Sequence, residues 1–127
     1  MKRGESGRIL VVDDQRTVAE MTAGLLRNLG HEVQVVLNGE AALEQVRSGR
    51  FDLVVCDIMM PGMDGYAAMT VIRQMPQFAT LPIIAVTARA MPSDRQKSLA
   101  AGASDYVTKP VDTDELLNCM ERWLAGS

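Results

Sequence analysis

The feature that most constrains this chain is a regular alternation of short apolar runs with longer amphipathic segments. Apolar runs occupy residues 9–12, 33–36, 53–56 and 83–86, and residues 106–108 form a fifth, shorter run. A continuous apolar run of this length is typical of a strand that is covered on both faces. The order βαβαβαβαβα requires right-handed crossovers and a parallel sheet between two helical layers. The pattern therefore predicts a doubly wound α/β fold.

Length and charge limit what such a domain can do. The chain has 127 residues, the size of one domain, and a net charge of −3. This balance argues against nucleic-acid binding, which normally needs a basic face. No apolar stretch approaches the ~20 residues of a membrane span, and residues 1–7 lack the apolar region of a signal peptide. We expect a cytoplasmic domain without membrane contact.

The predicted first helix has an apolar stripe that stops at Gly30. The stripe consists of Val18, Met21, Leu25, Leu26 and Leu29. Most of the nine methionines, including Met21, are expected to fill the core or loops. Cys56 and Cys119 lie in apolar segments without metal-ligand spacing, so both are expected to be small buried residues. The single histidine, His31, is expected to be a loop residue.

Polar side chains follow four of the five predicted strands at the point where each strand ends. Asp13 and Asp14 follow the first strand, Asp57 the third, Thr87 the fourth and Lys109 the fifth. Ligands of such folds bind at the carboxyl ends of the strands, near the point where the strand order reverses. We therefore expect these side chains to share one site.

Three carboxylates repel one another unless a cation joins them. Oxygen ligands without thiolate or imidazole favour a hard ion such as Mg²⁺. The ion, Lys109 and Thr87 would suit phosphoryl oxygens, with a carboxylate as nucleophile. Each residue also has a plainer interpretation: Asp13 or Asp14 would cap the first helix, and Lys109 would be a solvated surface residue. Their arrival at one edge favours a site for an aspartyl-phosphate.

Four segments carry a resemblance to a known family. They are VVDD at 11–14, DIMMPGMDG at 57–65, AVTA at 85–88 and AGASDYVTKP at 101–110. Together they closely resemble the receiver domain of two-component response regulators. The resemblance covers residues 8–125 and makes residues 1–7 an N-terminal tail or linker. It implies a flavodoxin-like (βα)5 fold with helices on both faces and the strand order 2-1-3-4-5.

The resemblance also implies roles for individual residues. Asp57 would accept a phosphoryl group from a partner phosphohistidine. Magnesium, which Mn²⁺ can replace, would be held by Asp13, Asp14, Asp57 and the backbone carbonyl of Met59.

A second group of residues would bind the phosphoryl group on Asp57 and respond to it. Lys109, the Thr87 hydroxyl and the Ala88 backbone N–H would bind the phosphoryl group, and Tyr106 would turn inward. This change would reshape the face made by the fourth helix, fifth strand and fifth helix. Such a switch needs only a few charge-assisted contacts acting on a two-state element.

Two further positions are expected to set the lifetime of the phosphoryl group. Met59, two residues after the acceptor, cannot hydrogen-bond an attacking water. Arg89, two residues after Thr87, would screen the acyl phosphate. We therefore expect a long-lived phosphoryl group.

The subclass most resembles receivers attached to hybrid histidine kinases. The expected partner is a histidine kinase or a histidine phosphotransfer protein, and a kinase core in the same full-length chain is one of the partners considered. The expected role is that of a signalling phosphoacceptor that assists its own phosphorylation and dephosphorylation, and not that of an enzyme.

Two alternatives stay open. The first is a receiver-like interaction module that is never phosphorylated, although such modules usually lack an acidic, Thr or Lys site residue. The second is a phosphatase with an aspartyl-phosphate intermediate. Haloacid dehalogenase-like phosphatases carry an acid/base Asp where this chain has Met59.

Overall fold

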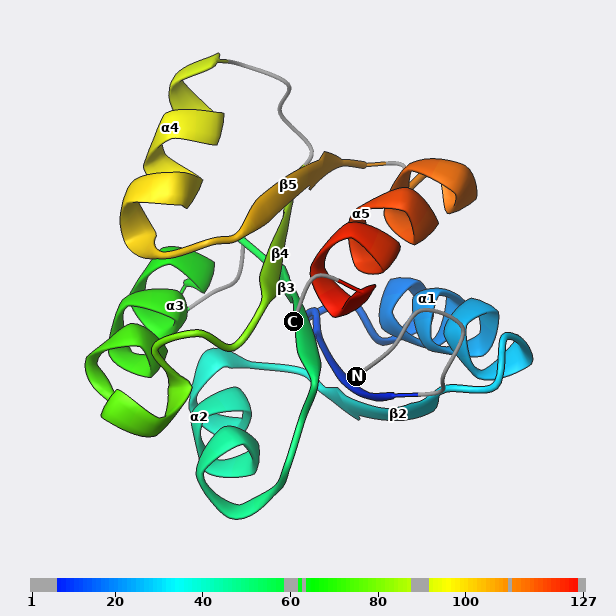
Figure 1. The fold of residues 1–127 in the computed structure, drawn as a ribbon, viewed down its shortest axis with the longest axis horizontal. Helices are drawn as coiled ribbons and strands as arrows, with labels where there is room; N and C mark the ends of the chain where they lie inside the picture. Colours follow the sequence, from blue (N-terminus) through cyan, green and yellow to red (C-terminus); the bar gives the residue numbers. More distant parts are fainter. Residues whose placement is uncertain (1–6, 59–61, 63, 88–91, 110, 126–127) are drawn as a thin grey trace.

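The computed structural model describes residues 7–58, 62, 64–87, 92–109 and 111–125. Strands and helices alternate along the chain (Figure 1). The strands are β1 (Arg8–Val12), β2 (Glu32–Val36), β3 (Leu53–Asp57), β4 (Ile83–Thr87) and β5 (Asp105–Thr108). The helices are α1 (Arg16–Asn28), α2 (Gly39–Ser48), α3 (Gly65–Gln74), α4 (Pro92–Ala101) and α5 (Thr113–Ala125), with a short 3₁₀ helix η1 (Pro76–Phe78) after α3. The predicted α/β class is confirmed.

The five strands form one parallel sheet in the order β2-β1-β3-β4-β5. This order confirms the flavodoxin-like prediction. The chain moves from β1 to one side of the sheet for β2 and then to the other side for β3. The carboxyl ends of β1 and β3 therefore lie next to each other where the winding direction reverses, which is where such folds bind ligands.

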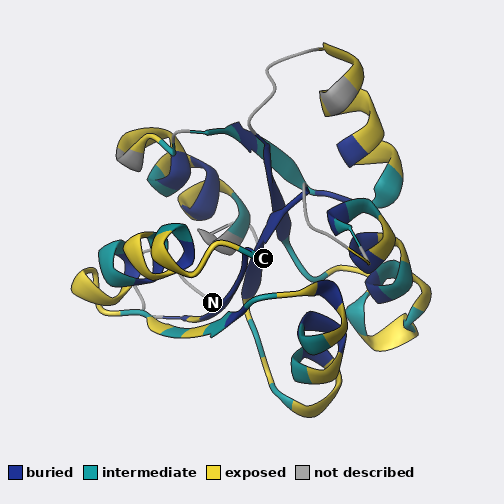
Figure 2. Ribbon diagram, turned by 180° about the vertical axis from the view of Figure 1, so that it is seen from behind, coloured by how far each residue is buried: buried dark blue, intermediate teal, exposed yellow. Residues whose placement is uncertain are grey.

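The helices form two layers that enclose the sheet. Helices α1 and α5 cover one face, and α2, α3 and α4 cover the other (Figure 1). Each helical layer packs against a separate apolar cluster on its face of the sheet. Leu10 and Val54 belong to the cluster on the α2–α3 side, whereas Ile9 and Val55 belong to the cluster on the α1–α5 side. Because helices cover both faces of the sheet, the central strands are dark blue in Figure 2.

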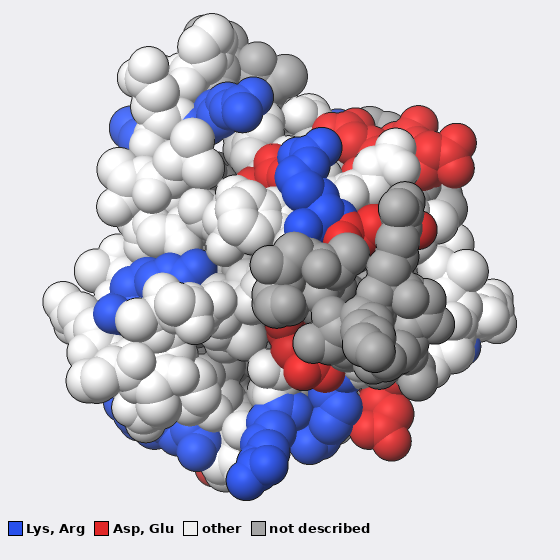
Figure 3. Space-filling model, viewed as in Figure 1, with Lys and Arg blue, Asp and Glu red and all other residues white. Residues whose placement is uncertain are grey.

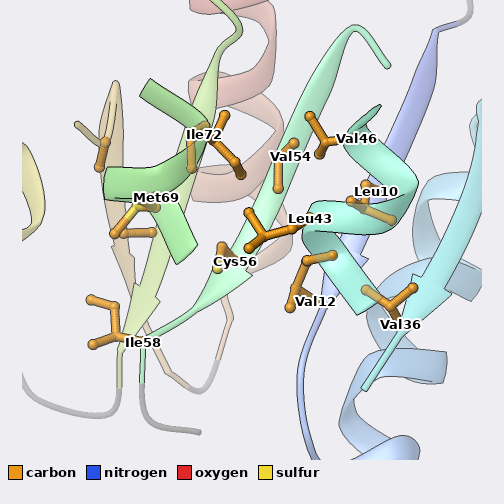
Figure 4. Packing of buried hydrophobic residues seen from close by; sticks show 14 residues of the cluster. Leu10, Val12, Val36, Leu43, Val46, Val54, Cys56, Ile58, Met69 and Ile72 are labelled. Atoms are coloured by element: carbon orange, nitrogen blue, oxygen red, sulfur yellow. The ribbon is translucent and has the colours of Figure 1, made fainter. Parts of the chain in front are cut away.

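The α2–α3 layer shows how the core is filled. Leu43 from α2 and Met69 and Ile72 from α3 point towards strand residues that include Val54 and Cys56 (Figure 4). All five residues of β3 and of β4 are buried, whereas the edge strand β2 is exposed at alternate positions. The central strands are therefore fully buried, and site residues lie at or just beyond their carboxyl ends.

The predicted stripe of α1 is partly wrong. Met21 is 71% exposed and Leu29 is 50% exposed. The buried residues of α1 are Ala19, Ala23 and Leu26. Two alanines in the contact row let the helix backbone lie close to the sheet. Leu26 of the predicted stripe shares that row, whereas Met21 and Leu29 lie outside it. Among the methionines, the core prediction holds for Met69 and Met120 but not for Met21.

Several other local predictions are confirmed. Cys56 and Cys119 are buried free thiols. His31 lies between α1 and β2, where its Nδ1 accepts a hydrogen bond from the Gly7 N–H at 3.0 Å. Within the described ranges, every helix is too short or too polar to cross a bilayer.

Candidate functional site

Three carboxylates meet at the carboxyl edge of the sheet. Asp13 and Asp14 follow β1, and Asp57 is the last residue of β3, the neighbouring strand. One carboxylate oxygen from each lies within 4.8 Å of the others. Asp57 is 3% exposed and Asp13 is 5% exposed, whereas Asp14 is more accessible. The predicted convergence of these residues is therefore found in the structure.

Asp13 does not cap the first helix. The N-cap of α1 is Gln15, which makes no side-chain cap bond. Asp13 Oδ1 accepts a hydrogen bond from the Gln15 backbone N–H at 2.9 Å, one residue before the helix begins. By contrast, Asp64 Oδ1 does cap α3 through the Ala67 N–H at 2.8 Å. Asp64 therefore has a structural role as a helix cap, whereas the second carboxylate oxygen of Asp13 points into the acidic cluster.

Lys109 joins two of the carboxylates. Its Nζ lies 3.2 Å from Asp13 Oδ2 and 3.2 Å from Asp57 Oδ2. Burial lowers the pKa of Lys109, but the charges of Asp57 and Asp13 and its hydrogen bonds to both outweigh burial and raise that pKa. The ammonium therefore stays charged at neutral pH. The interpretation of Lys109 as a solvated surface residue is wrong.

Thr87 reaches the same edge from β4. It is 2% exposed, and its backbone carbonyl accepts a hydrogen bond from the Lys109 N–H at 2.6 Å. Tyr106 lies one strand further out, on β5, and is half-buried. The other predicted site residues, Met59, Ala88 and Arg89, lie outside the described residues.

The charges of the described site residues do not balance. Three carboxylates and one ammonium leave a formal charge of −2. Asp13, Asp57 and Lys109 also line a small pocket whose other walls are mostly valines. Burial raises the pKa of the neighbouring Cys56 thiol to about 12, with help from the charges of Asp57, Asp13 and Asp64. An oxygen-only donor set with this excess charge fits a hard divalent cation.

The wider surface carries both signs of charge. Figure 3 shows acidic side chains near the start of α5, and basic side chains scattered over other parts of that face. The first turn of α5 contains Asp114 and Glu115, which are favourably placed for the helix dipole. The electrostatic feature specific to the site is therefore the local acidic cluster and not the overall surface charge.

Sequence reasoning missed one residue that touches the acceptor. Gly65 is the first residue of α3, and its N–H donates a hydrogen bond to the Ile58 carbonyl at 2.9 Å. The available signal was the Asp64-Gly65 pair at the start of a predicted helix, eight residues after Asp57. A pair of this kind usually indicates only a turn, so the close approach itself could not be predicted.

Comparison with known proteins finds similarity in sequence and in fold. The chain is 38% identical over 119 residues to the signal transduction histidine-protein kinase BarA of Escherichia coli K12, covering 94% of this chain but only 13% of BarA. The chemotaxis protein CheY4 of Vibrio cholerae superposes with a TM-score of 0.89 at 30% identity, over 94% of this chain and all of CheY4.

A third similar protein has a structure that contains a bound metal ion. The receiver domain of a sensor histidine kinase from Pseudomonas aeruginosa PAO1 superposes with a TM-score of 0.88 at 36% identity, over 97% of this chain and all of that domain. That structure contains a magnesium ion coordinated in the active site cleft. Residues 9–121 of this chain match the family model of the response regulator receiver domain. The chain therefore belongs to the response regulator receiver domain family.

Proposed function

We propose that this chain is a phosphoacceptor of a two-component phosphorelay and that Asp57 receives the phosphoryl group. One observation carries the proposal: Asp57 is buried, its Oδ2 contacts the Lys109 ammonium, and two further carboxylates lie within 4.8 Å. A structural aspartate is usually satisfied by a cap or a single ion pair. An acidic cluster with excess negative charge is instead suited to a cation and a phosphoryl group.

In the proposed reaction, a carboxylate oxygen of Asp57 attacks the phosphorus of a phosphohistidine on the partner. A P–O bond forms and the P–N bond breaks. The imidazole nitrogen leaves with the electron pair and takes up a proton from solvent. Lys109 offsets charge on the phosphoryl oxygens, while the Thr87 hydroxyl and the Ala88 N–H donate hydrogen bonds to them.

Magnesium would be held by Asp13, Asp14, Asp57 and the Met59 carbonyl, and Mn²⁺ can replace it. When bound, the ion neutralises charge on the transferring group. Asp13 is held for this role by the Gln15 N–H on one oxygen and by Lys109 on the other. Preorganised ligands of this kind bind a cation with little rearrangement.

The output would be a change in the face formed by α4, β5 and α5, initiated by Thr87 and Tyr106. Helix α4 suits a moving element because its described side chains are mostly exposed and Ser98 is the buried one. Few buried contacts mean a low free-energy cost for displacing such an element. We propose that this face binds the partner that reads the phosphorylation state.

The partner that supplies the phosphoryl group would be a histidine kinase or a histidine phosphotransfer protein. The similarity to BarA supports a receiver of the hybrid-kinase type, with residues 8–125 as the domain and residues 1–7 as a tail or linker. The chain spans 13% of BarA, so a kinase core in the same full-length chain is part of the proposal. In this role the domain assists its own phosphorylation and dephosphorylation.

The direct test is intact mass after incubation with acetyl phosphate and Mg²⁺. We expect wild type to gain one phosphoryl group and Asp57→Ala to gain none. Asp52→Asn, at the other end of the β3 segment, is the matched control and should be phosphorylated like wild type. If wild type binds Mg²⁺ yet gains no phosphoryl group from acetyl phosphate or a phosphohistidine donor, the chain would be a phosphorylation-independent interaction module.

The proposed long lifetime of the phosphoryl group can be tested in the same assay. Met59→Asn and Met59→Glu place a polar group where it can orient an attacking water, so both should shorten the half-life of the phosphorylated form. The remaining phosphorylated fraction is followed by mass after the donor is removed. An unchanged half-life would contradict the role given to Met59, and Arg89→Ala tests the screening role of Arg89 separately.

A further inference from the structure

The start of α3 lies directly on the backbone of the phosphoacceptor segment. Asp64 caps the helix through the Ala67 N–H, and the Gly65 N–H donates to the Ile58 carbonyl at 2.9 Å. The first turn of α3 is thus connected to the residue that follows Asp57 by a short, buried hydrogen bond.

Only a residue without a side chain fits at this contact. A Cβ atom built on Gly65 would lie 2.6 Å from Ile58 Cα, and still closer to the Asp57 carbonyl oxygen. Both neighbours are backbone atoms, which cannot rotate away as a flexible side chain can. To reach ordinary van der Waals contact at 3.4 Å, the two segments must separate by roughly 1 Å.

The sheet holds the acceptor segment from the other side. Asp57 pairs with Val86 of β4, and the Ile58 N–H donates to the Val86 carbonyl at 2.9 Å. Helix α3 is in turn fixed by Met69 and Ile72, which are buried in the core. A side chain at position 65 would therefore act as a wedge between two anchored elements.

We propose that Gly65 is a positioning residue for Asp57. Its missing side chain lets α3 lie against the Asp57–Ile58 backbone, and this contact sets the position of the Asp57 carboxylate relative to Asp13 and Lys109. The functional part of this inference rests on the proposed function: if Asp57 binds metal and accepts the phosphoryl group, a misplaced carboxylate would weaken metal binding and phosphoryl transfer. The geometric part, a shift of the Asp57–Ile58 backbone, can be measured without metal or phosphate.

The backbone conformation of Gly65 does not itself require glycine. The described glycines with positive φ are Gly30, Gly62 and Gly102. An alanine at position 65 therefore tests the close approach alone. Gly24, in α1, is a matched control because a Cβ there meets nothing within 4 Å. Gly24→Ala should leave the site unchanged.

The experiment compares wild type, Gly65→Ala, Gly24→Ala and Ile72→Ala. Ile72→Ala removes a buried side chain further along α3, so it lowers stability without touching the Asp57 backbone. Three quantities are measured well below each melting temperature: the amide NMR shift and hydrogen exchange of Ile58 without metal, the Mg²⁺ Kd by calorimetry, and the phosphorylation rate with acetyl phosphate.

We expect Gly65→Ala to displace the Ile58 amide signal, speed its exchange, and raise the Mg²⁺ Kd several-fold. We also expect it to slow phosphorylation by about 100-fold, the usual effect of a misplacement of about 1 Å. Ile72→Ala should lose stability and keep the wild-type Kd. A folded Gly65→Ala with wild-type Kd and rate would overturn the inference. Wild type that fails to bind Mg²⁺ or be phosphorylated would instead count against the proposed function.

A second pair of variants covers the case in which Gly65→Ala does not fold. Asp64→Ser keeps the cap of α3 without the charge, whereas Asp64→Ala loses both. If the first turn of α3 positions Asp57, Asp64→Ala should bind Mg²⁺ more weakly than Asp64→Ser. Asn38 caps α2 in the same way, through the Ala41 N–H at 2.7 Å, so Asn38→Ala is the control. Equal Kd values for the two Asp64 variants would contradict the inference.

Discussion

Replacing Asp57 with asparagine is expected to make the metal-free protein more stable. At an effective dielectric constant of about 20, two charges at the 4.8 Å upper limit of the cluster repel by about 3.5 kcal/mol, so the Asp57 charge costs at least about 7 kcal/mol against Asp13 and Asp14. Its attraction to Lys109 at 3.2 Å returns about 5 kcal/mol. Asp14 is the more accessible partner and its share is smaller, which leaves a net gain of about 1–2 kcal/mol for Asp57→Asn.

The assay is urea unfolding in EDTA, followed by circular dichroism, for wild type, Asp57→Asn and Asp52→Asn. A gain of 1–2 kcal/mol corresponds to a rise of about 4–8 °C in Tm for a domain of this size. Asp52→Asn should change stability by less than about 0.5 kcal/mol, as expected for a substitution away from the cluster. An Asp57→Asn protein that is less stable than wild type in EDTA would refute the claim that the cluster repels itself.

Added magnesium should reduce or reverse the difference in stability between Asp57→Asn and wild type. An ion that binds the native state stabilises it by RT ln(1 + [Mg²⁺]/Kd), so wild type should gain Tm steadily as the ion is added. Asp57→Asn offers one charged ligand fewer and should gain less. A wild-type melting curve that does not move across the titration would contradict the proposed metal site.

Three further predictions concern groups other than the site carboxylates and Lys109. Arg73 donates to the carbonyls of Phe78 and Gly102 and to the Ser104 hydroxyl, which lies just before β5. Arg73→Met should therefore cost about 2–3 kcal/mol in urea unfolding and Arg73→Lys less; equal stability of Arg73→Met and wild type would contradict this. Burial raises the pKa of Asp105, but hydrogen bonds and a nearby arginine outweigh it and hold that pKa below 3.8, so its stabilisation is present above pH 3.8 and is lost as pH falls through the folded pKa. Asp105→Asn should therefore destabilise the protein at pH 7 and much less at pH 3, and an equal loss at both values would exclude this linkage. Burial is the largest cause of the raised pKa values of Cys56 and Cys119, about 12 and about 11, so a thiol reagent at pH 8 should modify both only as the protein unfolds; rapid labelling of the native protein would show that the thiols are accessible.

The elements and their convergence could be predicted because both follow from local patterns. Continuous apolar runs identify strands, and the residue after each run must lie at the carboxyl edge of a parallel sheet. This reasoning predicts that Asp13, Asp57, Thr87 and Lys109 share one edge, where the structure has them. The residue-level roles implied by the resemblance remain proposals, because they concern a reaction and a metal.

What could not be predicted depends on distances between segments. The predicted stripe of α1 consists of large apolar residues, and Leu26 among them is buried, but the helix also lies on the sheet through Ala19 and Ala23, whose small size permits the approach. The same limit hid the contact of Gly65 with the Asp57 backbone. The sequence shows which residues have small side chains, but it does not show which other segment lies close enough to require them.

The connections within the site also bear on when it can form during folding. Lys109 and Asp57 are 52 residues apart in the sequence, and Asp13 lies further still from Lys109. Contacts of such long range carry a large loop-closure entropy and form only when β1, β3 and β5 are all in the sheet. Partly folded chains that have closed only the β1–β3 half would therefore lack the ammonium and hold uncompensated carboxylates. Formation of the complete site thus requires β4 and β5 to have joined the β1–β3 pair.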